Sequence, residues 1–245
     1  MASPAHSGIA PETVLYAIGD IHGRCDLLAD ITAKIAADAA QRRARRRVVI
    51  YLGDYVSRGI DSRRVIDMLM QAPPDDCEQV TLRGNHEDLL LRYLDGDMDA
   101  GRHWFDYDGQ DTLADYGVEI GDRRQRDKAS MIMLRDRFEA ALPLSHLEFF
   151  RSTRTSYPAA GYFFVHGGVR PGVPLELQEP HDCMWIRDAF LNSPAQHGAV
   201  VVHGHSISEQ PEVRSNRVGI DTGAYRSGVL TCLVIDGTER SFLHT

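Results

Sequence analysis

Five short stretches of this chain place carboxylate, amide or imidazole side chains next to glycine. In chain order they read GDIHG at 19–23, GDYVSRG at 53–59, GNHE at 84–87, HGG at 166–168 and HGH at 203–205. Oxygen and imidazole donors without a thiolate suit hard or borderline divalent ions such as Mn²⁺, Fe or Zn²⁺. These residue types therefore predict a metal site with enough ligands for catalytic chemistry.

Each of the five stretches follows a short, mostly apolar run that is rich in β-branched or aromatic residues. The runs lie at 14–18, 48–52, 80–82, 162–165 and 200–202. Such runs are typical of buried strands, and open α/β sheets place their ligands at the carboxyl ends of strands. We therefore expect the five stretches to meet at one edge of a common core.

Six side chains are candidate metal ligands on this basis: Asp20, His22, Asp54, Asn85, His166 and His205. Six ligands are too many for one catalytic ion that keeps open coordination positions. They fit two ions roughly 3.5–4 Å apart that share a bridging carboxylate. The set as a whole supports this prediction, since a single histidine is more often structural than a ligand.

The overall charge limits the classes of partner. The chain has 245 residues, with 27 Lys and Arg against 35 Asp and Glu, which gives a net charge of −8. This balance argues against a general nucleic-acid binder, because such proteins are usually basic. Four scattered cysteines without a Cys-x-x-Cys pair favour a reducing compartment. With no apolar signal-peptide stretch and no run of transmembrane length, a cytoplasmic protein without membrane contact is expected.

The spacing of apolar residues predicts the elements that position these motifs. Helices are expected at 26–40, from 61 or 62 onward, at 89–94 and at 127–141. The first half therefore alternates strand and helix, which predicts a parallel sheet. A hairpin is expected over 149–165, and further strands are expected at 199–202, 217–220 and 229–235.

The domain organisation follows from the same pattern. Residues 1–12 are expected to be a disordered lead, and residues 13–245 a single domain. The glycine-rich segment at 95–125 is predicted to be irregular. Its part at 96–117 is expected to form a mobile cover near the site, with packing of aromatics such as Trp104 on the core as the equal alternative.

The order and spacing of GDIHG, GDYVSRG, GNHE, HGG and GHS resemble a known family. They are similar to the phosphoprotein phosphatase (Ser/Thr phosphatase) branch of the calcineurin-like metallophosphoesterases, especially its bacterial and phage members. The likeness runs from about Tyr16 to about Leu233. It implies a β-sandwich of two mixed sheets flanked by helices, whereas the residues alone indicate a mixed α/β chain with an antiparallel C-terminal part.

The resemblance implies a role for each candidate ligand. Asp20 and His22 would hold the first ion, and Asp54 would bridge the first ion to the second. The second ion would also be bound by Asn85, His166 and His205. Both ions would be divalent, with Mn²⁺ expected and Fe or Zn²⁺ as alternatives. His203 would be a core or supporting residue, because the family places its ligand in the Gly-His pair.

The resemblance also implies a phosphate site and an acid. Arg58 and Arg187 match the arginines of the family that bind phosphate with Asn85, and a bidentate guanidinium suits phosphate oxygens. His86 matches the general acid that protonates the leaving group. The chain departs from the family at Ser57, where an aspartate usually pairs with that histidine. This departure puts the strength of acid catalysis in question.

The function implied is a metal-dependent phosphomonoester hydrolase in which a hydroxide activated by two metals attacks in line. The first interpretation is a Ser/Thr protein phosphatase, with dual specificity included, whose partners are phosphorylated proteins or peptides. Segments 109–117 and 221–225 favour it by their likeness to bacterial protein phosphatases. The alternatives are a symmetrical dinucleoside tetraphosphate hydrolase and a non-catalytic phosphate-binding protein.

Overall fold

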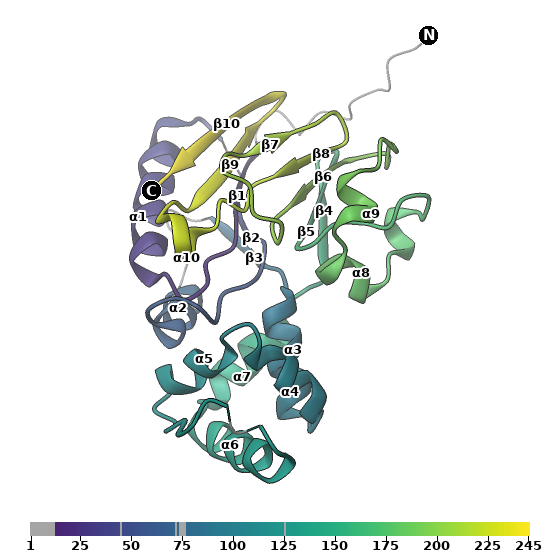
Figure 1. The fold of residues 1–245 in the computed structure, drawn as a ribbon. Coiled ribbons are helices and arrows are strands. Elements are labelled where there is room, and N and C mark those ends of the chain that lie inside the picture. The colour runs from purple at the N-terminus through teal and green to yellow at the C-terminus, as the bar shows by residue number, and fades with distance from the viewer. Residues whose placement is uncertain (1–12, 45, 72, 74–76, 125) are drawn as a thin grey trace.

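The computed structural model describes residues 13–44, 46–71, 73, 77–124 and 126–245. The predicted disordered lead at 1–12 lies outside these residues. Two β-sheets form the upper part of the molecule in Figure 1, and a group of helices lies below them. No helix in the described part of the chain is long and apolar enough to cross a membrane.

The first sheet has five strands: β1 (Thr13–Ile18), β2 (Arg46–Tyr51), β3 (Glu78–Thr81), β9 (Thr231–Asp236) and β10 (Glu239–His244). Their order across the sheet is β10-β9-β1-β2-β3. β1, β2 and β3 are parallel, whereas β9 is antiparallel to both β1 and β10. The predicted parallel sheet with an antiparallel C-terminal part is confirmed here.

The second sheet also has five strands: β4 (Ser156–Ala159), β5 (Tyr162–Val165), β6 (Val200–His203), β7 (Glu212–Val213) and β8 (Arg217–Gly219). Their order is β4-β5-β6-β8-β7, with parallel pairs in the centre and antiparallel pairs at both edges. Two mixed sheets flanked by helices confirm the expected fold class. The β4–β5 hairpin is also confirmed, although its predicted start at 149 lies in helix α7 (Leu144–Ser152).

The surroundings of β1 explain why its apolar residues are continuous and do not alternate with polar ones. Leu15 and Ala17 point between the two sheets and join a buried cluster with apolar side chains of the second sheet. Tyr16 and Ile18 point the other way, into the cluster formed with α1 (Cys25–Gln41). Because both faces of the strand are covered, no position on β1 needs a polar side chain.

The remaining helices of the sandwich pack on its outer faces. α1 and α2 (Ser62–Leu69) contribute to the buried cluster on the first sheet, and Asp61 caps α2 by accepting a hydrogen bond from the Arg64 backbone N–H. The second sheet is covered by α8 (Pro180–Trp185) and α9 (Asp188–Leu191), which follow the short helix η1 (Leu175–Leu177). α10 (Ala224–Ser227) lies beside the start of α1, where the Arg24 side chain donates to the Ala224 carbonyl.

Five helices form the group below the sheets (Figure 1): α3 (Asn85–Leu94), α4 (Met98–Phe105), α5 (Gly109–Asp115), α6 (Lys128–Ala141) and α7. The prediction that 95–125 is irregular was therefore wrong for α4 and α5, whereas 116–124 contains no helix or strand, as predicted. Gly101 and Gly109 were interpreted as loop residues, but both lie in helices. A Cβ atom at Gly101 would lie 2.3 Å from the Tyr93 ring, and one at Gly109 would lie 2.5 Å from the Trp104 ring. These glycines allow close helix packing.

Candidate metal centre

The predicted ligands come together where β1, β2, β5 and β6 end and α3 begins. Asp20 and His22 follow β1, Asp54 follows β2, Asn85 opens α3, and β5 and β6 are followed by His166 and His205. All six side chains are buried, and none is more than 5% exposed. Charged and imidazole groups are costly to bury alone, so their convergence points to a shared cation site.

Asp54 lies at the centre of the arrangement. Its carboxylate belongs to two groups whose ligand atoms lie within 4.8 Å of one another, one with His22 and His86 and the other with His166 and His205. The Asp54 oxygens are 3.5 Å from His22 Nε2 and 3.4 Å from His166 Nε2. One carboxylate shared by two ligand groups is the arrangement expected of a dinuclear site.

The imidazoles are oriented for metal binding. His22 Nδ1 lies 2.9 Å from the Val56 carbonyl and His166 Nδ1 lies 3.0 Å from the Leu52 carbonyl. A proton on each Nδ1 is the usual support of a metal-ligating histidine, and it leaves Nε2 facing the cluster, where His166 Nε2 lies 3.0 Å from Asn85 Oδ1. His205 Nε2 is buried and has no hydrogen-bond partner among the described residues. The donor set therefore fits divalent ions.

Asp20 lies beside a carboxylate that was not predicted as part of the site. Asp221 is 3% exposed, and its charge acts on Asp20. Burial and the charge of Asp221 raise the pKa of Asp20 well above its usual value. Two carboxyl groups this close favour a cation or a proton between them. Asp221 follows β8 as Asp54 follows β2, so the strand-end pattern could have identified it.

Glu87 supports the loop that carries Asp54 through hydrogen bonds to its backbone. Its carboxylate accepts backbone hydrogen bonds from Asp54 at 2.8 Å, Tyr55 at 2.8 Å and Gly84 at 2.9 Å. The side chain is fully buried, and this burial raises the pKa of Glu87. Because it holds the backbone on both sides of Asp54, Glu87 fixes the position of the shared carboxylate.

Glu87→Gln is expected to lower the free energy of unfolding by about 1–3 kcal/mol, because one amide N–H would face backbone N–H donors. Urea denaturation measures this loss. Glu148→Gln, the same change at an exposed position on α7, is the matched control and should have little effect. A loss at Glu87 no larger than that of the control would contradict the supporting role.

Backbone strain is concentrated at this site. Seven described non-glycine residues have a positive φ, and five of them lie in the motifs: His22, Asp54, Ser57, Arg58 and His205. Each such residue costs roughly 1–2 kcal/mol when it is not glycine. Strain of this kind persists where the surrounding structure fixes the conformation, and it is typical of functional sites.

The two arginines act on different ligand groups of the centre. Arg58 is half-buried, and its Nη1 lies 3.1 Å from His22 Nε2, beside the first ligand group. Arg187 is exposed at the start of α9 and acts electrostatically on His205 in the second group. Burial, together with the charges of His166 and Arg187, holds the pKa of His205 well below its usual value.

His86 lies within the first ligand group, but without the partner of a general acid. Its Nε2 is 3.9 Å from Asp54 Oδ2, which is too far for a hydrogen bond. Its Nδ1 is buried and has no hydrogen-bond partner in the described part of the chain. Burial lowers the pKa of His86. The role of His86 as an acid therefore stays a prediction.

Ser57 is bonded to residues other than His86. Its hydroxyl accepts a hydrogen bond from Trp104 Nε1 at 3.0 Å, and its backbone N–H donates to Thr112 Oγ1 at 3.0 Å. Both partners come from the helical group, and Ser57 and Trp104 are fully buried. Ser57 therefore joins the loop that carries Asp54 to α4 and α5. This is the position at which the similar family has an aspartate.

His203 lies outside both ligand groups. It is buried, its Nδ1 is 3.0 Å from the Gly204 carbonyl, and its ring meets the Phe190 ring edge-on at 5.2 Å. It is thus a core residue, in agreement with its expected place beside His205.

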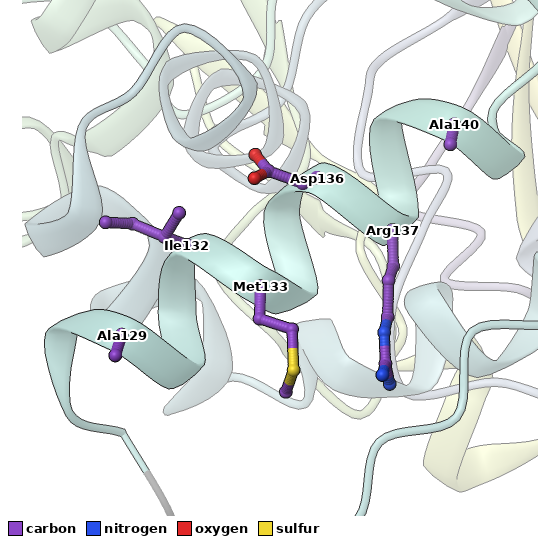
Figure 2. Close-up of a pocket in the computed structure, with 6 residues that line it drawn as sticks. All are labelled: Ala129, Ile132, Met133, Asp136, Arg137 and Ala140. Carbon is purple, nitrogen blue, oxygen red and sulfur yellow. The ribbon is translucent and has the colours of Figure 1, made fainter.

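A hollow on the outer face of α6 is separate from the metal centre. Figure 2 shows its lining side chains: Ala129, Ile132, Met133, Asp136, Arg137 and Ala140. α6 lies at the end of the helical group far from the sheets (Figure 1). Asp136 is paired with Arg135, and no histidine or second carboxylate lines the hollow. We assign it no part in phosphoester chemistry.

Comparison with known proteins defines the class. Residues 13–228 match the family model for calcineurin-like phosphoesterases, which spans most of the chain. The protein therefore belongs to the calcineurin-like phosphoesterase family. With its buried His and Asp groups, it is a metal-dependent phosphoesterase with a site consistent with two metal ions.

Its relatives carry two kinds of name. The asymmetrical bis(5′-nucleosyl)-tetraphosphatase PrpE of Oceanobacillus iheyensis is 23% identical over 87% of this chain and 85% of its own length. A symmetrical bis(5′-nucleosyl)-tetraphosphatase of Ralstonia nicotianae is 30% identical over 74% of this chain and 55% of its own length. Serine/threonine-protein phosphatase 2 of Escherichia coli is 23% identical over 89% of this chain and 90% of its own length.

A solved structure with a provisional assignment as a diadenosine tetraphosphatase has the same fold. It has a TM-score of 0.62 and 17% identity, and the match covers 99% of this chain and 96% of that chain. At this level of identity the likeness concerns the fold alone. The comparisons place the chain in the calcineurin-like phosphoesterase family. They do not place it in the expected phosphoprotein phosphatase branch, because the relatives divide between two activities.

Proposed function

We propose that this protein hydrolyses dinucleoside tetraphosphates. The expected protein phosphatase activity becomes the second candidate, because most of the named relatives are bis(5′-nucleosyl)-tetraphosphatases. One observation of the site supports the same choice. His86 has no hydrogen bond to a carboxylate within the described residues, and the neutral Ser57 hydroxyl bonds to Trp104.

The chemistry of the leaving group explains why this observation matters. Cleavage of a phosphoester of serine releases an alkoxide, which needs a proton from a well-oriented acid. Cleavage of a phosphoanhydride releases a nucleotide whose terminal phosphate is already a stable anion. A site with a poorly supported acid is therefore better matched to a dinucleoside polyphosphate than to phosphoserine.

The proposed roles of the residues follow from their positions. Two divalent ions, with Mn²⁺ expected, would supply activation of water and stabilisation of charge on the phosphate. Arg58 and Arg187, which act on different ligand groups, would bind phosphate oxygens, together with Asn85. Asp54 would bind both ions, and Glu87 would fix the position of the Asp54 backbone.

A comparison of substrates tests the proposal. The Mn²⁺-loaded protein is offered diadenosine tetraphosphate, a phosphoserine peptide and a phosphotyrosine peptide, and kcat/KM is measured for each. We expect the highest value for diadenosine tetraphosphate. Chromatography of the products reads the cleavage point, since ADP alone marks symmetrical cleavage and ATP with AMP marks asymmetrical cleavage.

The second candidate, a protein phosphatase, is favoured by the Escherichia coli relative, which matches over nearly the full length of both chains. A higher kcat/KM for the phosphopeptides would overturn the proposal in its favour. Absence of turnover on every substrate, with metal bound, would instead support the non-catalytic alternative.

A further inference from the structure

An aromatic ring lies against each of the two ligand groups. The Tyr225 ring meets the His22 ring edge-on, with centroids 5.4 Å apart and planes at 85°. The Trp185 ring meets the His205 ring in the same manner, at 6.3 Å and 79°. His22 belongs to the first ligand group and His205 to the second. The two rings therefore lie beside different ligand groups of the metal centre.

An arginine acts on each of the two ligand groups. The Arg58 guanidinium lies 4.9 Å from the centroid of the Tyr225 ring. Arg187 is two residues after Trp185 in the chain, and its charge acts on His205. Each ligand group thus has an aromatic ring beside one of its histidines and the charge of an arginine acting on it, which suits a phosphate that carries an aromatic group.

The Trp185 ring is held in a stack that joins the sandwich to the helical group. His103 of α4 lies 5.3 Å away at 15°, and His181 of α8 lies 6.2 Å away at 17°. Both histidines are exposed, and Trp185 is half-buried. The stack is therefore a fixed aromatic surface that solvent reaches, unlike Trp104, which is fully buried.

We propose that Tyr225 and Trp185 with its stacked histidines bind the two nucleobases of a dinucleoside polyphosphate, one base beside each ligand group of the metal centre. This inference rests on the proposed function and specifies how the substrate is recognised. A ligand with a phosphate chain in the middle and a flat ring at each end matches a centre in which each ligand group has a ring beside it and the charge of an arginine acting on it. A phosphoserine peptide has no obligatory ring, and phosphotyrosine has one.

Fluorescence gives a test that does not depend on turnover. The chain has two tryptophans, of which Trp104 is fully buried and Trp185 is half-buried. We expect AMP to quench the fluorescence of the Mn²⁺-loaded protein, whereas ribose 5-phosphate, which has the same phosphate without a base, leaves it unchanged. In Trp185→Phe the quenching should disappear, because the reporting ring is replaced. Equal quenching by the two ligands, or none by AMP, would overturn the proposal.

Steady-state kinetics tests the two proposed base-binding rings, Trp185 and Tyr225. Stacking of a base on an aromatic side chain contributes enough that Trp185→Ala and Tyr225→Ala should each raise KM for diadenosine tetraphosphate about tenfold. Inorganic tetraphosphate, which has no base, is the reference substrate, and the KM for its hydrolysis should change much less. Tyr225→Phe keeps the ring and should restore the KM for diadenosine tetraphosphate.

Tyr157→Ala is the matched control, because Tyr157 is a half-buried tyrosine on β4 that accepts a hydrogen bond from Arg46 and packs against Phe164. Equal KM increases on both substrates in the site variants would overturn the proposal. If diadenosine tetraphosphate is not hydrolysed but AMP still quenches Trp185, the proposed function fails and the base surface stands. If it is hydrolysed with unchanged KM in both alanine variants, the base surface fails and the function stands.

Discussion

Asp54→Asn is expected to abolish hydrolysis and to lower metal content. The Asp54 carboxylate is the member common to both ligand groups, and the change removes its negative charge from both at once. Loss of a residue that merely supports a metal ligand typically costs about 10–100-fold in affinity or activity. Loss of the shared ligand should therefore exceed the upper end of that range. Steady-state kinetics and metal analysis of the purified variant measure the two effects.

A buried carboxylate outside the site provides the control for this variant. Asp182 is 7% exposed and is paired with Arg170 on the second sheet's outer layer. Asp182→Asn should leave metal content and turnover close to the wild-type values. Wild-type turnover and metal content in Asp54→Asn would rule out a centre built around this residue.

Trp104→Ala is expected to lower the free energy of unfolding by about 3–5 kcal/mol, the range typical of large aromatic deletions in cores. Trp104 is fully buried among the rings of Tyr93, Phe105 and Phe138. It also donates the hydrogen bond to Ser57. The structure thus favours the packing alternative over the expected mobile cover at 96–117.

Trp104→Phe separates the two contributions. It keeps most of the apolar volume but removes the indole N–H, so Ser57 would lose its donor, at a cost of about 1–3 kcal/mol. Urea denaturation of both variants measures the losses. A Trp104→Ala protein that keeps wild-type stability but changes KM would contradict the core role and favour the mobile cover.

The site was largely predictable because its chemistry follows strand ends in the sequence. The apolar run at 48–52 and the Gly53-Asp54 pair are adjacent in the chain, so the position of Asp54 at the edge of a sheet could be inferred locally. The same holds for His166 after β5 and for His205 after β6. These three side chains do converge, as one core requires.

The contacts that were missed depend on residues far apart in the chain. Ser57 bonds to a tryptophan 47 residues later, and nothing near Ser57 in the sequence indicates that partner. In the sequence, Gly101 and Gly109 look like loop residues. The aromatic rings that pack against them, Tyr93 and Trp104, each belong to a neighbouring helix, so the need for glycine is not visible locally. Glycine reports a need for space or for unusual backbone angles, and only the tertiary structure distinguishes the two.

Two metal ions are predicted to share the Asp54 carboxylate. A crystal structure of the Mn²⁺-loaded protein with an anomalous difference map tests it most directly. We predict two peaks roughly 3.5–4 Å apart, the spacing typical of two-metal sites, one beside His22 and the other beside His166, with Asp54 between them. A single peak, or two peaks of which one does not contact Asp54, would contradict the account.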